Sequence, residues 1–250
     1  MNSSSKASAF AALHVAGDPF VLYNIWDAGS AQAVAAAGAK AIATGSASVA
    51  AANGLDDGEA VPLELALDNA RRIVAAVEMP VTIDFEGGYA VEPEAVARNL
   101  ASLAETGAIG CNFEDQVVGG SGVHPIDVQC RRIEAAGRAV GEAFFINART
   151  DLFLQANPED HVSLIDDALE RARAYAGAGA SGFFVPLLAD LKLLERVCAH
   201  SPLPVNFMAF PGCPSNAEVA TAGVARISHG PFPHRALMKQ LEESALEALG

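Results

Sequence analysis

The sequence alternates short apolar runs with alanine-rich segments in which apolar residues recur at helical spacing. Short, bounded apolar runs are typical of buried parallel strands, and the longer periodic segments are typical of the helices that cover them. The expected strands are 20–26, 39–44, 81–85, 110–113, 144–148, 182–185, 204–207 and 226–228. The expected helices are 6–15, one following Ser30 as N-cap and ending at Gly38, then 63–77, 93–106, 128–140, 164–176, 187–200, 216–222 and 233–249. Eight strand and helix units without a linker predict one (β/α)₈ barrel domain over residues 1–250, with an open doubly wound sheet as the alternative.

Composition narrows the classes of partner. The 250 residues are 51% hydrophobic, which is enough for one large core, and the formal net charge is −14. A strongly acidic chain repels phosphate backbones and anionic lipids, so we expect neither a nucleic acid nor a membrane surface as partner. The four cysteines form no CxxC pair, which predicts free thiols in a reducing compartment. The segment 1–8 lacks the features of a secretory signal and no apolar run could span a bilayer, so a cytoplasmic location is expected.

Polar residues follow the expected strands at the ends where a barrel places its active site. Asp84 and Glu86 point the same way from the end of strand 81–85, and two such carboxylates suit a hard divalent cation. The other strand ends carry Trp26 and Asp27, Thr44 to Ser46, Glu114 and Asp115, Asn147, Arg149 and Asp151, Asn206, and His229. We interpret this converging set as an active site, although polar residues are also common in loops that have no function.

Several of these residues have a structural interpretation beside the functional one. Arg149 could pair with Asp151 or Glu114, or its planar fork could bind a substrate carboxylate. The segment 44–47 is interpreted as backbone and hydroxyl donors to an anion, because Ser46 lacks the flanking pattern of a nucleophilic serine. His124 and His229 are isolated and do not indicate a zinc site.

Five stretches carry a resemblance to a known family: NIWDAGSAQAVAAAGAKAIATGSASVA at 24–50, Asp57 after Gly54, IDFEGGYA at 83–90, GCNFEDQ at 110–116 and INARTD at 146–151. In this order they resemble the isocitrate lyase/phosphoenolpyruvate mutase superfamily. The resemblance implies a modified barrel that binds Mg²⁺ or Mn²⁺ and a small α-keto or 2-hydroxy acid, and whose reaction passes through an enolate-like state. It also implies a homo-oligomer, dimer or tetramer, in which the last helix, 233–249, packs on a neighbouring subunit.

By motif position, the resemblance assigns the metal to Asp84, Glu86 and Glu114, with Asp57 as a further acid near it. It assigns the substrate to Arg149 and to the segment Gly45, Ser46 and Ala47. Trp26 and Asn206, at the ends of their strands, are added as candidate substrate contacts.

The chain departs from the family where the reaction is chosen. The lyases carry a Lys-x-Cys-Gly-His loop after the Glu-Asp pair, whereas this chain has QVVGGSGVHPID at 116–127. Ser121 and His124 are the proton-transfer candidates that this glycine-rich loop offers. The expected function is therefore that of a carbon–carbon lyase or decarboxylase, with a phosphonate mutase or hydrolase and a non-catalytic keto-acid binder as alternatives.

Overall fold

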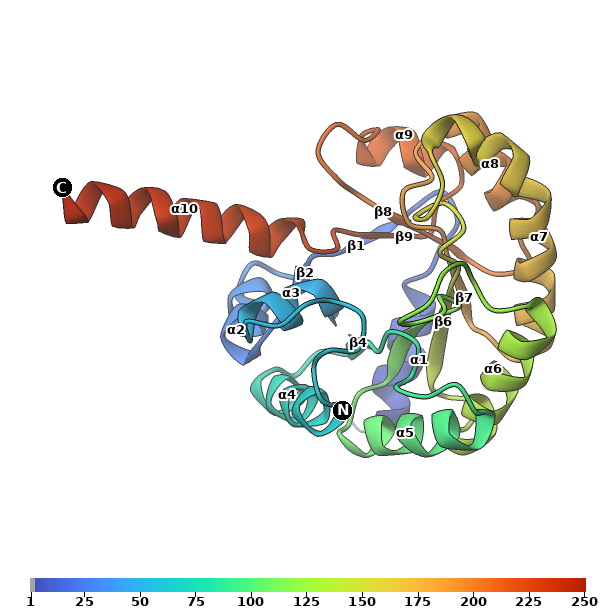
Figure 1. The fold of residues 1–250 in the computed structure, drawn as a ribbon, viewed down its shortest axis with the longest axis horizontal. Helices are drawn as coiled ribbons and strands as arrows, with labels where there is room; N and C mark the ends of the chain where they lie inside the picture. Colours follow the sequence, from blue (N-terminus) through green and yellow to red (C-terminus); the bar gives the residue numbers. More distant parts are fainter. Residues whose placement is uncertain (1–2) are drawn as a thin grey trace.

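Nine parallel strands form a single sheet in the computed structural model, which describes residues 3–250. The strands are β1 (Phe20–Leu22), β2 (Asn24–Ile25), β3 (Ile42–Thr44), β4 (Val81–Asp84), β5 (Gly110–Glu114), β6 (Phe145–Arg149), β7 (Gly182–Phe184), β8 (Val205–Met208) and β9 (Arg226–Ser228). Their order is β1-β9-β8-β7-β6-β5-β4-β3-β2, so the sheet curls until its two edges meet in a nearly closed barrel (Figure 1). The predicted barrel is confirmed, and the open sheet is excluded.

The barrel closes where the first expected strand is broken. Residues 20–26 form two short strands on either side of Tyr23, whose side chain is exposed. Phe20–Leu22 pairs with β9, whereas Asn24–Ile25 pairs with β3, so one stretch of chain provides both edges. Asn24 spans the junction, because its Oδ1 accepts from the amides of His229 and Gly230 while its Nδ2 donates to the carbonyl of Thr44.

Helices ring the barrel and follow the expected positions, with differences at their ends. They are α1 (Ser3–Ala12), α2 (Ala28–Ala36), α3 (Ser46–Ala52), α4 (Leu63–Ala76), α5 (Pro93–Glu105), α6 (Ile126–Val140), the 3₁₀ turn η1 (Pro158–Asp160), α7 (His161–Gly177), α8 (Leu191–His200), α9 (Asn216–Thr221) and α10 (Phe232–Leu249). The largest core lies between this ring and the outward faces of the strands, and includes Phe85, Phe113, Phe183 and Phe207.

Three local expectations were wrong for identifiable reasons. Asp27, not Ser30, is the N-cap of α2, and Ser30 returns a bond to the amide of Asp27 as the third residue of a capping box. Helix α8 begins at Leu191 rather than at residue 187, because Leu187 has a left-handed backbone (φ 64°) and Asp190 caps the helix. Helix α3 was not predicted, since its sequence of serine and alanine with one valine shows no apolar periodicity.

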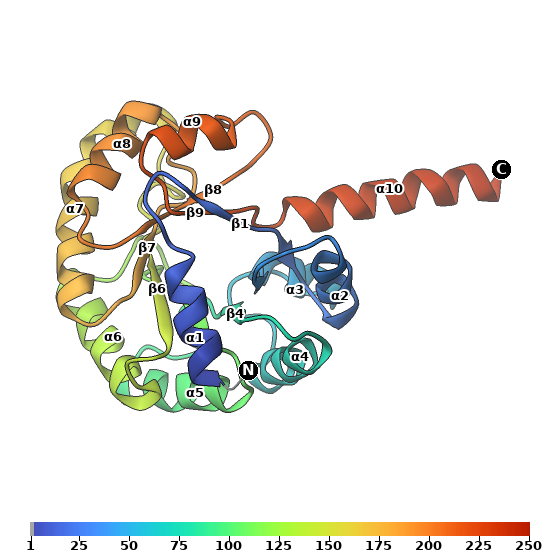
Figure 2. The same ribbon diagram turned by 180° about the vertical axis from the view of Figure 1, so that it is seen from behind.

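Helix α1 covers the N-terminal end of the barrel, opposite the strand ends that carry the acids; Figure 2 shows it in front of the strands. Its Phe10 is fully buried and packs edge-on against Phe20 and Phe145. His14 follows the helix, stacks on Phe145 at 4.2 Å and donates from Nδ1 to the carbonyl of Phe10 at 3.0 Å. These aromatic rings fill the end of the barrel and exclude water from its interior.

Helix α10 leaves the barrel and extends away from it (Figure 1). Only its first turn is buried, through Pro233 and His234. Farther along, the apolar side chains Leu237, Met238, Leu241 and Leu246 are 39–67% exposed. Contiguous exposed apolar residues of this kind mark a surface that another molecule covers.

Two further observations concern the cysteines and the apolar character of the helices. All four cysteines are free, as the sequence predicted. Among residues 3–250, no helix has the length and apolar character needed to cross a membrane.

We expect His14→Phe to change the pH dependence of stability. Burial, with the charge of Arg226 adding to it, lowers the pKa of His14 to about 3. Between pH 6.5 and 3 the unfolded chain therefore takes up a proton that the folded chain does not, and stability is lost as pH falls. The free energy of unfolding of His14→Phe should therefore rise relative to that of the wild type by up to about 1.4 kcal/mol for each pH unit below 6.5.

Urea unfolding at several values between pH 7.5 and 4.5 measures this difference. His200→Phe is the matched control, because His200 is exposed at the end of α8. A free-energy difference between His14→Phe and the wild type that stays constant with pH would contradict the burial of a neutral His14.

We also expect the intact chain to be a homo-oligomer that depends on α10. A double change of Leu241 and Leu246 to Glu places charges on the exposed apolar face and should give a monomer in light scattering, with an unchanged circular dichroism spectrum. Lys239→Gln with Glu243→Gln, which alters only an exposed polar pair on the same helix, should leave the oligomer intact. A monomeric wild type would overturn the prediction.

Candidate active site

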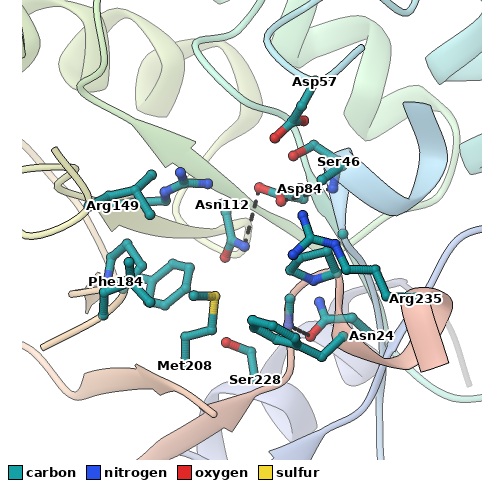
Figure 3. A pocket seen from close by; sticks show the side chains of 18 residues that line it. Asn24, Ser46, Asp57, Asp84, Asn112, Arg149, Phe184, Met208, Ser228 and Arg235 are labelled. Carbon is teal, nitrogen blue, oxygen red and sulfur yellow. Dashed lines mark hydrogen bonds between the residues drawn. The ribbon is translucent and has the colours of Figure 1, made fainter. Parts of the chain in front are cut away.

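A cavity of about 270 Å³ opens at the C-terminal ends of the strands. Its polar lining comprises Asn24, Gly45, Ser46, Asp57, Asp84, Asn112, Arg149, Ser228 and Arg235, and its apolar lining includes Ala47, Leu154, Phe184, Met208 and Phe232. Figure 3 shows Asp57, Ser46 and Asp84 on one side, Arg149 and Phe184 on the other, and Asn112 between them. The structure thus brings together Gly45, Ser46, Ala47, Asp57, Asp84 and Arg149 from the residues selected by sequence.

Asp84 is fixed at the edge of the cavity by three neighbouring elements. Its Oδ2 accepts from the amide of Ser46, the first residue of α3, at 3.0 Å. Its own amide donates to Thr44 Oγ1 at 2.8 Å, and Oδ1 faces the side-chain amide of Asn112 at 3.4 Å. The short helix α3 therefore orients the carboxylate rather than merely following β3.

Asp57 reaches the mouth of the same cavity from the loop between α3 and α4. Part of the residue is exposed, but the surroundings withdraw its carboxyl group from water, and this burial together with the Asp84 carboxylate raises its pKa. A hydrogen bond from the side chain of Ser46 opposes the rise. Its raised pKa makes Asp57 a candidate proton carrier at the cavity.

The carboxylate of Glu86 holds the loop that carries Asp57. Glu86 Oε2 accepts from the amides of Gly58 at 2.9 Å and Glu59 at 2.6 Å. In return, Glu59 Oε1 accepts from the amide of Tyr89 at 2.7 Å, so the two loops are joined by reciprocal bonds. Glu86 faces a small hollow beside the main cavity. Asp84 and Ser46 also line this hollow.

Arg149 pairs with both of the acids that the sequence offered as its partners, and it also lines the cavity. Its Nε and Nη2 bond to the two oxygens of Asp151 at 2.5 and 2.9 Å, and its Nη1 lies 2.8 Å from Glu114 Oε2. Burial alone would lower the pKa of Arg149, but these two carboxylates outweigh it and raise the pKa well above its ordinary value. A guanidinium has five N–H groups, so one on each terminal nitrogen remains to face the cavity.

Asp115 anchors this arrangement from behind. It is fully buried and accepts from Tyr175 Oη at 2.7 Å, from Arg171 Nη1 at 3.1 Å and from the amide of Asp151 at 3.0 Å. Arg171 also donates to the carbonyl of His124, which ties α7 to the end of the glycine-rich loop. The pairing of Arg149 with Asp151 is therefore held in place by a buried network.

The predicted metal ligands do not converge directly. Within residues 3–250 no three side chains of His, Cys, Asp or Glu surround a common point as ligands. Asp84 lines the cavity, whereas Glu86 is bonded to backbone amides and Glu114 to Arg149. Carboxylates nevertheless outnumber arginines here, and oxygen donors of this kind fit a hard cation that is held by one carboxylate and keeps much of its water.

Besides Glu86 and Glu114, four of the selected residues lie outside the cavity in this structure. Trp26 packs edge-on against His234 beneath α10, and the side chain of Asn206 is buried in bonds to Asn147, Phe207, Arg226 and Ser228. Ser121 is exposed in the glycine-rich loop, and His124 is buried at the end of that loop.

The sequence did not identify four polar residues that line the cavity: Asn24, Asn112, Ser228 and Arg235. Asn112 lies two residues before Glu114, and Ser228 lies two residues after Arg226. Because side chains alternate along a strand, each pair shares the inward face, and this alternation could have identified Asn112 and Ser228. Arg235 belongs to the first turn of α10, and no sequence pattern places that turn at the cavity.

Comparison with known proteins relates the whole chain to one family. The sequence profile described as phosphoenolpyruvate phosphomutase matches residues 10–249. An uncharacterized protein of Mycobacterium tuberculosis is 37% identical, with 91% of this chain and 84% of that protein aligned. A solved Burkholderia cenocepacia structure, described as a candidate phosphonomutase, is 47% identical with a TM-score of 0.96 over 99% of this chain and 100% of the other.

More distant relatives have named activities. The 2-methylisocitrate lyase of Salmonella typhimurium is 28% identical over 97% of this chain and 84% of its own length. A phosphonopyruvate hydrolase solved with oxalate and Mg²⁺ shares the fold, with a TM-score of 0.84 and 20% identity over 97% of this chain and 85% of the other.

We expect Glu86→Gln to remove a pH-dependent loss of stability in the metal-free protein. Burial raises the pKa of Glu86 to about 7, and the carboxylates of Asp57 and Asp84 add to this, although the amide of Glu59 opposes it. Between pH 4.5 and 7 the folded chain holds a proton that the unfolded chain has released, so stability falls as pH rises. The free energy of unfolding of Glu86→Gln should rise relative to that of the wild type by up to about 1.4 kcal/mol per pH unit across this window. The difference should stay constant above pH 7.

Urea unfolding in chelator measures the difference. Glu94→Gln, on the exposed face of α5, is the control for removal of one carboxylate. If the advantage of Glu86→Gln over the wild type is the same at pH 5 and pH 7, the proposed protonation of Glu86 is wrong.

Proposed function

The chain belongs to the phosphoenolpyruvate phosphomutase family, within the isocitrate lyase/phosphoenolpyruvate mutase superfamily, and we propose that it is a divalent-metal-dependent enzyme acting on a small α-keto or 2-hydroxy acid. The reaction passes through an enolate-like state, most simply by cleavage of a carbon–carbon bond or by decarboxylation. One observation carries the proposal: Asp84, Asp57, Arg149 and the segment 45–47 face one small cavity at the ends of the strands.

The size and charge of the cavity support a small acid. Its volume of about 270 Å³ lies below the roughly 300 to 1,000 Å³ typical of sites for larger ligands. Arg149 and Arg235 both line it, so two guanidinium groups are available for the carboxylates of a substrate. The apolar side chains Phe184, Met208 and Leu154 limit the space left for water.

The chemistry of the carboxylates supports Mg²⁺, or Mn²⁺, as cofactor. Asp84 would bind the cation directly, because it alone of the three lines the cavity, and Glu86 and Glu114 would bind it through water. Such a cation polarises a keto oxygen and stabilises negative charge that develops on it. The phosphonopyruvate hydrolase solved with oxalate and Mg²⁺ has the same fold.

The chain's own residues divide the remaining tasks. The amide of Ala47 and the hydroxyl of Ser46 lie at the first turn of α3, where amides lack partners within the helix, and would receive a substrate carboxylate. The free N–H groups of Arg149 would donate to the developing oxyanion. Asp57, whose pKa is raised, is the proton carrier already in the cavity.

The glycine-rich loop decides between the candidate reactions. It lacks the lysine and cysteine of the lyases, and Ser121 and His124 would serve as proton donors only if the loop moved over the cavity. The 47% identity to a candidate phosphonomutase favours phosphonate chemistry as the alternative, which release of inorganic phosphate or formation of a phosphonate would reveal. A keto-acid binder without activity would bind the same acids and form no product.

The test of the site uses oxalate, which is planar, doubly charged and able to chelate a metal as the enolate of pyruvate would. We expect calorimetry to show Mg²⁺-dependent oxalate binding that is tighter than malonate binding. Asp84→Asn keeps an oxygen for the amide of Ser46 but loses the charge, so the protein should stay folded and lose metal-dependent binding. Equal oxalate binding with and without Mg²⁺ would exclude the enolate mechanism.

Arg149→Lys is the matching test of the arginine. Lysine preserves a positive charge for Glu114 and Asp151, so two buried carboxylates are not left unpaired. It removes the planar fork, which should weaken oxalate binding by roughly 1.5 to 3 kcal/mol, or about 10- to 150-fold in Kd. Unchanged affinity would assign Arg149 to structure alone.

A further inference from the structure

The interior of the barrel beneath the cavity is polar where an apolar layer is usual. Asn112, Asn147, Asn206 and Arg226 point inward from β5, β6, β8 and β9, and each is at most 4% exposed. They are paired by strand register, Asn112 with Asn147 and Asn206 with Arg226. Gly182 on the strand between the two pairs makes room for them, because a Cβ there would lie 2.5 Å from Asn147 Oδ1.

The hydrogen bonds of this layer fix the orientation of Asn112. Its Oδ1 accepts from Arg226 Nη2 at 3.1 Å and from Asn147 Nδ2 at 2.9 Å. Two donors at one oxygen exclude the flipped amide, since the NH₂ group would then face two other N–H donors. The NH₂ group of Asn112 is therefore directed at Asp84 Oδ1 and at the cavity, as Figure 3 shows.

The orientation of Asn147 is fixed in turn. Its Nδ2 also donates to Asn206 Oδ1 at 3.1 Å. Asn206 directs its own NH₂ group at the carbonyls of Phe207 and Arg226 and at Ser228 Oγ. Arg226 is the one charged donor among these groups. Because a guanidinium can only donate, it determines which atom of each amide accepts and which donates along the chain.

Stability alone does not account for Arg226. Burying a guanidinium costs several kcal/mol unless it is well paired. Within residues 3–250, Nη2 has Asn112 as its acceptor, whereas Nε and Nη1 have no hydrogen-bond partner. An apolar side chain of similar volume would cost less at this place, so the residue has a use other than packing.

We propose that Arg226 is a positioning residue for the reaction: from beneath the floor of the cavity it fixes Asn112 so that Asn112 donates to Asp84 and to an anionic oxygen of the substrate. The inference rests on the proposed function, and it adds Asn112 as a substrate-binding residue. An Asn112 that presents its NH₂ group to the cavity donates most strongly to an anionic oxygen and offers no acceptor to an ammonium group. A flipped Asn112 would instead turn a carbonyl oxygen toward the carboxylate of Asp84.

The experiment compares Arg226→Met with a control on the same strand. Ile227 is fully buried and points outward into the helix-facing core, so Ile227→Ala destabilises β9 without touching the amide chain. With Mg²⁺ present, Arg226→Met should weaken oxalate binding about tenfold or more, a change of roughly 1.4 kcal/mol. Ile227→Ala should lose stability but keep its oxalate Kd within about twofold, and Arg226→Lys should recover most of the loss.

Arg226→Met that folds and binds oxalate with the wild-type Kd overturns the proposal, as does an equal loss of affinity in Ile227→Ala. If Arg226→Met does not fold, Asn112→Asp decides. That change preserves shape and pairs with Arg226, so the protein should remain folded, but it replaces the donor by a carboxylate and should weaken oxalate binding at least about tenfold. Wild-type affinity in Asn112→Asp would overturn the proposal.

A measurement without ligand separates this inference from the proposed function. If the wild type fails to bind oxalate, the proposed function fails, and the orientation of Asn112 is still tested by NMR. The side-chain amide protons of Asn112 should exchange slowly in the wild type, in Ile227→Ala and in Arg226→Lys, and rapidly in Arg226→Met. Equal protection of these protons in all the folded variants would show that Arg226 does not position Asn112.

Discussion

The structure depends on placing several carboxylates at one end of a barrel and compensating their charge. Asp57, Asp84, Glu86, Glu114 and Asp151 gather there. Burial raises the pKa of Asp57, Glu86, Glu114 and Asp151, and hydrogen bonds from the Ser46 amide and from Asn112 hold Asp84. Such groups are costly to bury unless they are paired or hydrogen-bonded. The compensation comes from two sources, arginines and backbone amides, and each source determines a different part of the architecture.

Hydrogen bonds from backbone amides to carboxylates determine the conformation of the loops beside the cavity. The amides of Gly58 and Glu59 are satisfied by Glu86, and that of Tyr89 by Glu59. Glu59, Glu86 and Tyr89 all have left-handed backbones, with φ of 61°, 50° and 57°. Non-glycine residues adopt such angles at a cost, so the reciprocal bonds between carboxylate and amide hold both loops in a strained arrangement that brings Asp57 to the cavity.

The sequence predicted the barrel because alternation of apolar runs and periodic helices is a local property of the chain. It also predicted that the acids lie at the C-terminal ends of the strands, since the strand ends of a barrel meet at one edge. It missed α3, whose serines and alanines carry no periodic signal, and the break at Tyr23, which only the closure of the sheet requires. It could not find the partners of Asn112, because register between distant strands decides which inward side chains meet.

Arg226 connects the two ends of the barrel interior. Its charge helps to lower the pKa of His14 on one side. Burial lowers the pKa of Arg226 itself to about 9, and the carboxylate of Asp84 on the other side opposes this fall. One buried cation thus lies between an aromatic plug that must stay neutral and an acidic site that needs positive charge. An apolar middle layer would pack at lower cost, but it would leave the amide of Asn112 free to flip and would remove a buried cation from beneath Asp84. The polar interior is therefore best understood as part of the site.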